Sequence, residues 1–494
     1  MEGETKSFWS SRWQLLCWAA VYLFVAAAIQ FYFVSVPYDA DTTYHVAVGR
    51  MIQAHGILHA FPWTPFSWLA DHYADKELLL HLLFVPLAEV SWVTAAKIVG
   101  TFLGAVLLFT LYMVLRAEKV PLAGVWALLP LVASDVFLFR FSLVRPHLLS
   151  IPLALLLLWA AARGRFIILA LVSAIYPWSY VAFWQLPLIL LFGVEAARIL
   201  SGERIRWKPI TAAFAGVLLG WLLHPNSMNL LKFNWIVVEV LFEKAWQSKG
   251  GIELGQEFLP FTLTQWAEWL LACVFMGIAG FVLAWRNRKK ESLSLAFALV
   301  TIAFGILTAR TARFAEYFIP FSVATFALAV RGIPWRTIPI IALCAILPYT
   351  GFALGETLHG IGMKIDRIPP SLVSWMREQI PKGSQVFTTE WGHTGTLMLA
   401  LPDRKFIVAL DPTLFLVKDP ELYQLWYRLP RNPEPGMAEI IRRKFGARFI
   451  ISFWEVRYEE FYYRLFLEPG VRTLLVSPLW MVYDLGPPHN KDNL

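Results

Sequence analysis

The sequence contains a series of long apolar runs, and these limit its fold more than any other feature. The first run covers residues 13–36 almost without interruption. At about 1.5 Å per residue, a helix of this length crosses about 30 Å of hydrocarbon. Only 16% of the 494 residues are charged, whereas a soluble protein needs roughly 25% to cover its surface. The chain is therefore predicted to be an α-helical polytopic membrane protein.

The basic residues between the apolar runs predict the orientation of the chain. Short basic turns near residues 116–119, 163–165, 198–208, 286–290 and 331–336 all fall on one side when about 11 transmembrane helices are counted. The positive-inside rule then makes the N-terminus cytoplasmic and the C-terminal residues extracytoplasmic, in a cytoplasmic (inner) membrane. The predicted spans are residues 13–36, 95–115, 120–138, 147–162, 165–178, 182–199, 209–224, 265–285, 293–309, 315–330 and 337–354.

Residues 77–92 are the one ambiguous apolar segment. They are short for a span and carry Pro86 and Glu89. Counting them as a span would reverse the orientation of everything that follows, so the basic turns favour a helix lying in the membrane interface.

Composition divides the chain into two parts. Residues 1–360 form the predicted transmembrane domain, with a large first external loop at residues 37–94. Residues 361–494 have ordinary charge density, and segments with strand patterns alternate there with helical ones, which predicts an extracytoplasmic α/β domain. The net charge of +8 is explained by membrane orientation, so no nucleic-acid partner is expected.

An acidic group follows the first predicted span. Asp39 and Asp41 are two residues apart, which places their carboxylates within about 7 Å, close enough to share a divalent cation such as Mg²⁺ or Mn²⁺. Alternatively, one of them acts as a base while the other supports it. His45 follows within the same segment, and Glu77 is a further candidate ligand for a metal ion. The competing interpretation is an ordinary acidic loop at the headgroup surface.

Basic residues on the same external side form a second group. They oppose the positive-inside bias, which suggests that an anion compensates them, and guanidinium groups bind phosphate through two parallel hydrogen bonds. The alternative is that they pair with acidic neighbours such as Asp135 and Glu316, or extend toward headgroups. The candidate residues for a lipid phosphate or diphosphate are Arg140, Arg145, His147, His224, Arg310 and Arg313.

A third candidate site lies in the C-terminal part. Glu390, Trp391 and His393 belong to a glycine-containing loop that directly follows a predicted strand. A loop with an aromatic ring and polar tips at such a position can form a binding edge for an acceptor. On residue types alone, an ordinary strand-to-helix turn is the competing interpretation.

Several of these motifs resemble a known family. Asp39-Ala40-Asp41-Thr42-Thr43-Tyr44-His45 resembles the Asp-x-Asp-x-x-x-His opening of bacterial polytopic GT-C-type glycosyltransferases, and it is distantly similar to the first loop of oligosaccharyltransferase catalytic subunits. Glu390-Trp391-Gly392 stands where oligosaccharyltransferases have a Trp-Trp-Asp-Tyr-Gly acceptor motif, of which only tryptophan and glycine are present. Further similar stretches are Trp63-Thr64-Pro65-Phe66-Ser67, Arg145-Pro146-His147 and His224-Pro225-Asn226.

The resemblance implies a GT-C-like fold and an inverting glycosyltransferase. Such an enzyme takes a sugar from a polyprenyl-phosphate or polyprenyl-diphosphate donor and transfers it to an extracytoplasmic glycan, lipid or protein, with Asp41, Asp39 and His45 as its catalytic residues. Two other functions stay open: a transporter or flippase of a lipid-linked glycan, and a non-catalytic subunit of envelope polysaccharide assembly. A transporter needs charged residues within its spans, and the predicted spans have almost none, which favours the enzyme.

Overall fold

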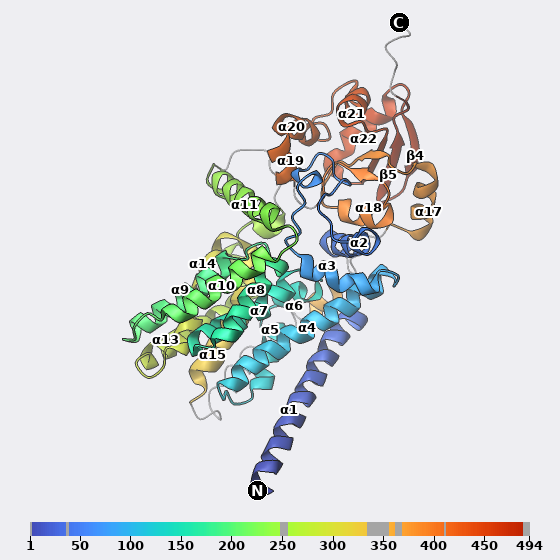
Figure 1. The fold of residues 1–494 in the computed structure, drawn as a ribbon. Helices are drawn as coiled ribbons and strands as arrows, with labels where there is room; N and C mark the ends of the chain where they lie inside the picture. Colours follow the sequence, from blue (N-terminus) through green and yellow to red (C-terminus); the bar gives the residue numbers. More distant parts are fainter. Residues whose placement is uncertain are drawn as a thin grey trace.

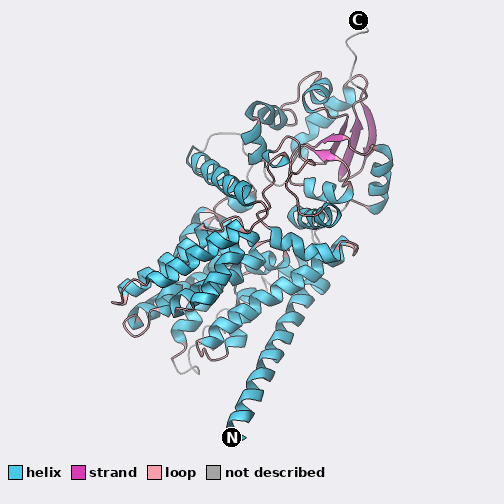
Figure 2. Ribbon diagram, in the orientation of Figure 1, coloured by secondary structure: helices cyan, strands magenta, loops and turns pink. Residues whose placement is uncertain are grey.

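The computed structural model describes residues 2–35, 39–247, 255–332, 355–360, 368–409 and 412–487. A bundle of helices carries a smaller C-terminal part at the end opposite the N-terminus (Figure 1). In its described residues the bundle is helical, and the strands lie in the C-terminal part (Figure 2). The apolar runs form helices because a helix satisfies every backbone N–H and C=O within its own segment, which lipid requires. The predicted span at residues 337–354 lies outside the described residues.

Within the described residues, five helical segments are long and apolar enough to cross a membrane: Arg12–Phe33, Trp92–Ala117, Leu263–Asn287, Leu293–Arg310 and Ala312–Val330. The first contains the end of α1 (Glu2–Ala27) and the π-helical turn Ala28–Phe33. Other helices coincide with predicted spans but are shorter, so the count of about 11 stays a prediction. The bundle also contains these described helices, some of which lie within the five segments: α4 (Trp92–Ala117), α7 (His147–Arg163), α8 (Phe166–Ser179), α9 (Gln185–Leu200), α10 (Trp207–Leu222), α11 (Ser227–Gln247), α12 (Leu263–Gln265), α13 (Leu271–Asn287), α14 (Leu293–Arg310) and α15 (Ala315–Val330).

The span predicted at residues 120–138 corresponds to a bent pair of helices, which together are apolar enough to cross a membrane. The segment forms two helices, α5 (Ala123–Ala133) and α6 (Asp135–Ser142), bent by 95° at the break between them. Ser134 has an extended backbone there, with φ −159° and ψ 128°, so the helical hydrogen-bond pattern is interrupted and restarts at Asp135. The bend matters for the site, because α6 and the turn after it carry Arg140 and Arg145.

The predicted basic turns lie together at one end of the bundle. Arg331 and Arg163 both form ion pairs with Glu118 and with Glu291, which joins the turns after α4, α7, α13 and α15. Ser292 Oγ also donates to Glu203 Oε1 at 2.7 Å, which adds the turn after α9. The prediction that these turns share one side is therefore confirmed.

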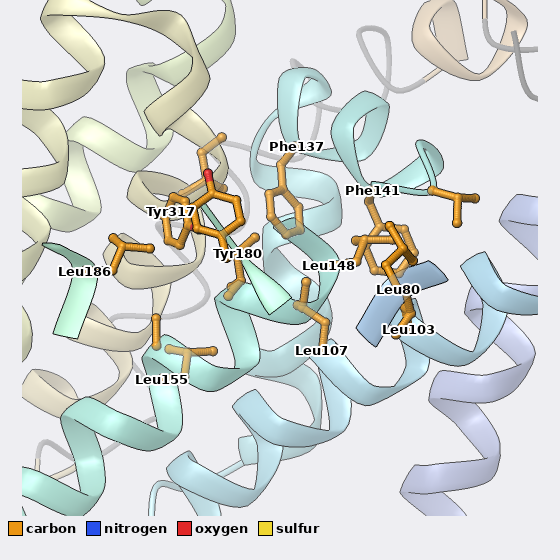
Figure 3. Close-up of a cluster of buried hydrophobic side chains, with 14 of the residues drawn as sticks. Leu80, Leu103, Leu107, Phe137, Phe141, Leu148, Leu155, Tyr180, Leu186 and Tyr317 are labelled. Atoms are coloured by element: carbon orange, nitrogen blue, oxygen red, sulfur yellow. The ribbon is translucent and has the colours of Figure 1, made fainter. Parts of the chain in front are cut away.

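The predicted first external loop, residues 37–94, is fixed to the bundle through two helices of its own, α2 (Ala40–His55) and α3 (Leu78–Phe84). Leu80 of α3 is fully buried, and its side chain lies among Leu103 of α4, Phe141 of α6 and Leu148 of α7 (Figure 3). The apolar helical segment Leu78–Leu87 has only ten residues, about 15 Å of helix, and is too short to cross a bilayer.

The C-terminal part contains a five-stranded sheet in the order β2-β1-β3-β5-β4. β1 is parallel to both β2 and β3, whereas β5 is antiparallel to β3 and β4, so β4 and β5 form a hairpin. The strands are β1 (Gln385–Phe387), β2 (Lys405–Phe406), β3 (Phe449–Phe453), β4 (Arg472–Val476) and β5 (Trp480–Asp484), and the helices are α17 (Pro370–Gln379), α18 (Thr394–Ala400), α19 (Thr413–Lys418), α20 (Pro420–Arg428), α21 (Met437–Phe445) and α22 (Glu459–Leu467).

The first loop lies between the bundle and the C-terminal part (Figure 1). α18 packs on α2, and the hydroxyls of Thr43 and Thr396 are hydrogen-bonded at 3.1 Å. Phe406 N donates to Trp63 O at 2.7 Å, and Trp63 Nε1 donates to Pro402 O at 2.8 Å. The loop that carries the acidic motif is thus held on both sides.

Candidate active site

The acidic motif forms the beginning of α2. Asp39 is the N-cap residue, and its carboxylate accepts hydrogen bonds from Thr42 N at 3.1 Å and from Thr42 Oγ1 at 2.5 Å. An aspartate at this position satisfies a backbone N–H that the helix leaves without a partner. Asp41 lies in the first turn, and its side chain keeps 29% of its surface exposed, compared with 5% for Asp39. The two carboxylates therefore have different surroundings.

Arg145 connects the acidic motif to the basic residues. It lies between α6 and α7, and its Nε donates to Asp39 Oδ2 at 2.8 Å. Its Nη1 is 2.8 Å from Asp41 Oδ2 and 3.0 Å from Glu257 Oε2. The two groups that the sequence analysis treated separately thus meet at one guanidinium.

Glu257 gathers two further arginines. It lies in the short 3₁₀ helix Gln256–Phe258 and accepts from Arg140 Nη1 at 2.7 Å and from Arg313 Nη1 at 3.1 Å. Arg140 also donates to Glu316 Oε2 at 2.6 Å, so the predicted alternative of pairing with Glu316 is confirmed for that arginine. We call these residues the ion cluster: Asp39, Asp41, Arg140, Arg145, Glu257, Arg313 and Glu316.

The carboxyl groups of the ion cluster differ in proton affinity. Burial acts to raise the pKa of Asp39, but the Arg145 charge and the hydrogen bonds from Thr42 and Arg145 outweigh it, and the pKa is lowered. Burial raises the pKa of Asp41, and the charges of Asp39 and Glu257 add to this effect against Arg145. Glu257 resembles Asp39, because its three arginines overcome burial and lower its pKa. Asp41 is thus the carboxyl in this part of the site that is suited to exchange a proton.

The other predicted basic residues lie beside the cluster or away from it. His147 is buried at the start of α7 and contacts two members of the cluster. Its Nε2 is 2.8 Å from Arg140 O, and its Nδ1 is 3.8 Å from Glu316 Oε2. His224 is buried elsewhere, where Nδ1 accepts from Asn226 N at 3.1 Å. Arg310 ends α14 with an exposed side chain and takes part in none of the ion pairs among the described residues.

Glu77 and His45 belong to a separate buried group. His45 Nδ1 is 2.9 Å from His81 Nε2 and 3.8 Å from Glu77 Oε2. The sequence analysis expected Glu77 to share a metal ion with Asp39 and Asp41. In the structure, Glu77 is instead grouped with two histidines. Burial, followed by the neighbouring His81, lowers the pKa of His45 well below its usual value, so His45 is neutral at neutral pH.

The predicted acceptor loop reaches the edge of the ion cluster. The Trp391 ring lies against Gly255, where an added Cβ would be 3.8 Å from Trp391 Cη2. Gly255 is two residues from Glu257. The indole Nε1 of Trp391 is buried and has no hydrogen-bond partner within the described part of the chain. His393, from the same loop, stacks on Phe453 with ring centroids 4.2 Å apart.

Glu390 shares a proton with a neighbouring carboxylate. Burial, and then the hydrogen bond to Glu455, raise its pKa to about 8 from an ordinary 4.5, although Arg457 Nη2 lies 2.5 Å from its Oε2. The folded protein therefore holds this proton at pH values where the unfolded chain has lost it. Stability should fall as the pH rises from about 5 to 8.

Glu390→Gln should flatten this pH dependence, because glutamine keeps a donor toward Glu455 and has no proton to lose. Melting temperatures measured from pH 5 to pH 9 would check the prediction. Glu421→Gln, at an exposed position of α20, is the matched control and should keep the wild-type profile. A Glu390→Gln profile as steep as that of the wild type would contradict the assignment.

Comparison with known proteins gives structural matches only. No family model matches the sequence, and no curated protein matches it. Among solved structures, the Archaeoglobus fulgidus oligosaccharyltransferase tethered to an acceptor peptide with the NVT sequon has a TM-score of 0.66 at 15% identity, over 90% of this chain and 70% of that one. ArnT from Cupriavidus metallidurans in the apo state has a TM-score of 0.56 at 14% identity, over 96% and 99%.

The mycobacterial arabinofuranosyltransferase AftD also matches, with a TM-score of 0.56 at 15% identity. The match covers 95% of this chain and 41% of AftD. At these identities the similarity concerns the fold. The chain has the fold of the GT-C glycosyltransferases, as the first-loop motif predicted.

Proposed function

We propose that this protein is an integral membrane glycosyltransferase that takes a sugar from a polyprenyl-phosphate or polyprenyl-diphosphate donor and transfers it to an extracytoplasmic glycan, lipid or protein. One observation carries the proposal: a partly exposed carboxylate with a raised pKa, Asp41, lies within ion-pair distance of Arg145 in a cluster of three arginines. The GT-C fold supports the same class of reaction.

The roles of the two aspartates follow from their surroundings. Asp41 acts as the general base toward the acceptor, because it has exposed surface and a raised pKa. Asp39 is a positioning residue, because both of its oxygens accept hydrogen bonds from Thr42 and Arg145. His45 supports Asp41 from the next turn of α2.

The arginines bind the donor phosphate. Arg140, Arg145 and Arg313 all point toward Glu257, whose carboxylate occupies a position that suits an anion. With every group ionised, four carboxylates face three guanidiniums, which leaves one negative charge in excess before a phosphate arrives. In the alternative role for Asp41, it would hold a divalent cation, Mg²⁺ or Mn²⁺, that offsets the charge of the phosphate. Asp39 suits that role less well, since three of its four lone pairs already accept hydrogen bonds.

The acceptor enters between the ion cluster and the loop with Glu390, Trp391 and His393. The buried Trp391 N–H without a partner is available to an acceptor oxygen, and an unsatisfied buried donor costs about 1–3 kcal/mol until one arrives. Membrane lipids surround the bundle, where the apolar donor chain would also lie.

Purified protein incubated with a panel of polyprenyl-phosphate sugars tests the proposal. We expect turnover of at least one donor by the wild type and its loss in Asp41→Asn. Absence of donor turnover across the panel, together with movement of intact lipid-linked glycan across vesicles, would overturn the enzyme in favour of a flippase.

The proposed location is a cytoplasmic (inner) membrane, with the C-terminal part outside. The turn between α13 and α14, which carries Arg288 and Lys290, lies at the other end of the bundle from the C-terminal part (Figure 1). A reporter fused after residue 290 should therefore be cytoplasmic, and one after residue 380 extracytoplasmic. Finding both reporters on the same side would contradict this topology.

A further inference from the structure

A second group of titratable side chains begins on α2 one helical turn after Asp41, and the proposed function uses only one of its members, His45. His45 of α2, His81 of α3 and Glu77 just before α3 each place one potential ligand atom within 4.8 Å of the others. Their side chains are 2%, 1% and 10% exposed. Both histidines thus point a ring nitrogen at the same small volume, beside a carboxylate.

Asp75 fixes the orientation and tautomer of one of these rings. Its Oδ2 is 2.8 Å from His81 Nδ1, so that nitrogen carries the proton and donates it to the carboxylate. His81 Nε2 then presents a lone pair toward His45 Nδ1, 2.9 Å away. A carboxylate behind a histidine in this way is the usual outer support of a metal-binding imidazole.

We propose that His45, Glu77 and His81 bind a divalent transition-metal ion of the Zn²⁺ class, with Asp75 as the supporting residue behind His81. The donor set of two imidazoles and one carboxylate suits Zn²⁺, whereas Mg²⁺ prefers six oxygens in an octahedron. Bonds of about 2.05 Å at a near-tetrahedral angle place two nitrogens about 3.3 Å apart. The two rings need to separate by only about 0.4 Å from their present spacing to accept the ion.

The alternative is a hydrogen-bonded relay without metal, in which His45 Nδ1–H donates to His81 Nε2. Binding of the ion needs a change of tautomer at His45, with its proton moved to Nε2, and both imidazoles stay neutral. The two states differ in one measurable property, which is stoichiometric binding of metal.

The position of the group indicates what the ion would do. His45 is one helical turn after Asp41 on α2, and His81 is next to Leu80, which anchors α3 in the bundle core. An ion shared by the two helices would hold α2, and with it Asp41, at a fixed distance from the bundle. This is a positioning role, and it does not depend on the proposed sugar transfer.

The described residues contain one other group with metal-ligand spacing, formed by Glu390, His393 and Glu455. It suits a cation less well, because Arg457 lies 2.5 Å from both carboxylates and already supplies a positive charge. We therefore assign the ion to the His45 group, and His393→Ala is a control for the other.

The test uses the full chain in detergent, purified without a histidine tag and stripped with a chelator. Titration calorimetry with Zn²⁺ should show one site per chain and a raised melting temperature, and the same concentrations of Mg²⁺ should show neither. These measurements on the unmutated protein need no variant to fold. A wild type that binds no stoichiometric Zn²⁺ would overturn the proposal.

Variants then locate the ion. Asp75→Asn should weaken Zn²⁺ affinity about 10- to 100-fold, and Glu77→Gln or His81→Ala should weaken it further. His55→Ala, at the exposed end of α2, and His393→Ala should bind as the wild type does. Zn²⁺ binding that survives in His81→Ala and Glu77→Gln but is lost in His393→Ala would overturn the assignment.

Discussion

Asp41→Asn should lower the rate of sugar transfer at saturating donor by about 10²-fold or more while the protein folds and inserts normally. General-base catalysis contributes about 10²- to 10⁴-fold, and the lower limit corresponds to roughly 2.7 kcal/mol of barrier. Asparagine has nearly the shape of aspartate but cannot take a proton from the acceptor. Because Asp41 is partly exposed and makes its ion pair through one oxygen, its loss should change the melting temperature little.

Asp39→Asn is the matched comparison for this prediction. Asparagine still caps α2, since it is as good an N-cap residue as aspartate, but the buried partner of Arg145 loses its charge. We therefore expect a lower melting temperature for Asp39→Asn than for Asp41→Asn. Turnover and melting temperature measured on the same preparations would separate the two roles. A folded Asp41→Asn protein with the wild-type rate would refute its assignment as the base.

The apolar runs predicted most of the bundle, because the length of a hydrophobic run and the position of basic turns are local properties of the sequence. The bend within the predicted span at residues 120–138 had a local signal as well. Ser134-Asp135 interrupts the run with the residue types that begin helices, and the structure restarts the helix there after a bend of 95°. The helix α11 was not predicted, because its segment mixes apolar with charged residues and resembles a surface loop.

The members of the site were predictable by type, but their contacts were not. Asp39 and Arg145 are 106 residues apart in the chain, and nothing local relates one to the other. Glu257 was missed because a single glutamate between two predicted spans carries no motif. Its signal was the unbalanced positive charge of the external arginines, which required an acidic partner close to them. Glu77 was grouped with the aspartates by charge, whereas the anchoring of α3 places it beside His45.

Arg145→Lys should weaken donor affinity by about 10- to 150-fold, with a smaller effect on the maximal rate. Lysine keeps the charge but has a single ammonium, whereas Arg145 uses Nε for Asp39 and Nη1 for Asp41 and Glu257. A charge-assisted contact to a partly desolvated phosphate is worth roughly 1.5–3 kcal/mol, and 1.4 kcal/mol corresponds to about a factor of ten. Donor concentration dependence at constant salt is the measurement.

Arg310→Lys is the matched comparison for Arg145→Lys. It tests an arginine that the sequence suggested for the phosphate but that lies outside the ion cluster. Arg310 was a candidate for the same phosphate, yet it is exposed at the end of α14 and outside the ion cluster, so its replacement should change donor affinity by less than about twofold.

If Arg145 only pairs with carboxylates, Arg145→Lys would lower the melting temperature and leave donor affinity unchanged. If the cluster binds phosphate, affinity must fall in Arg145→Lys and stay the same in Arg310→Lys. Equal losses in both variants would mean that diffuse positive charge, and not the geometry of the three clustered guanidiniums, attracts the donor.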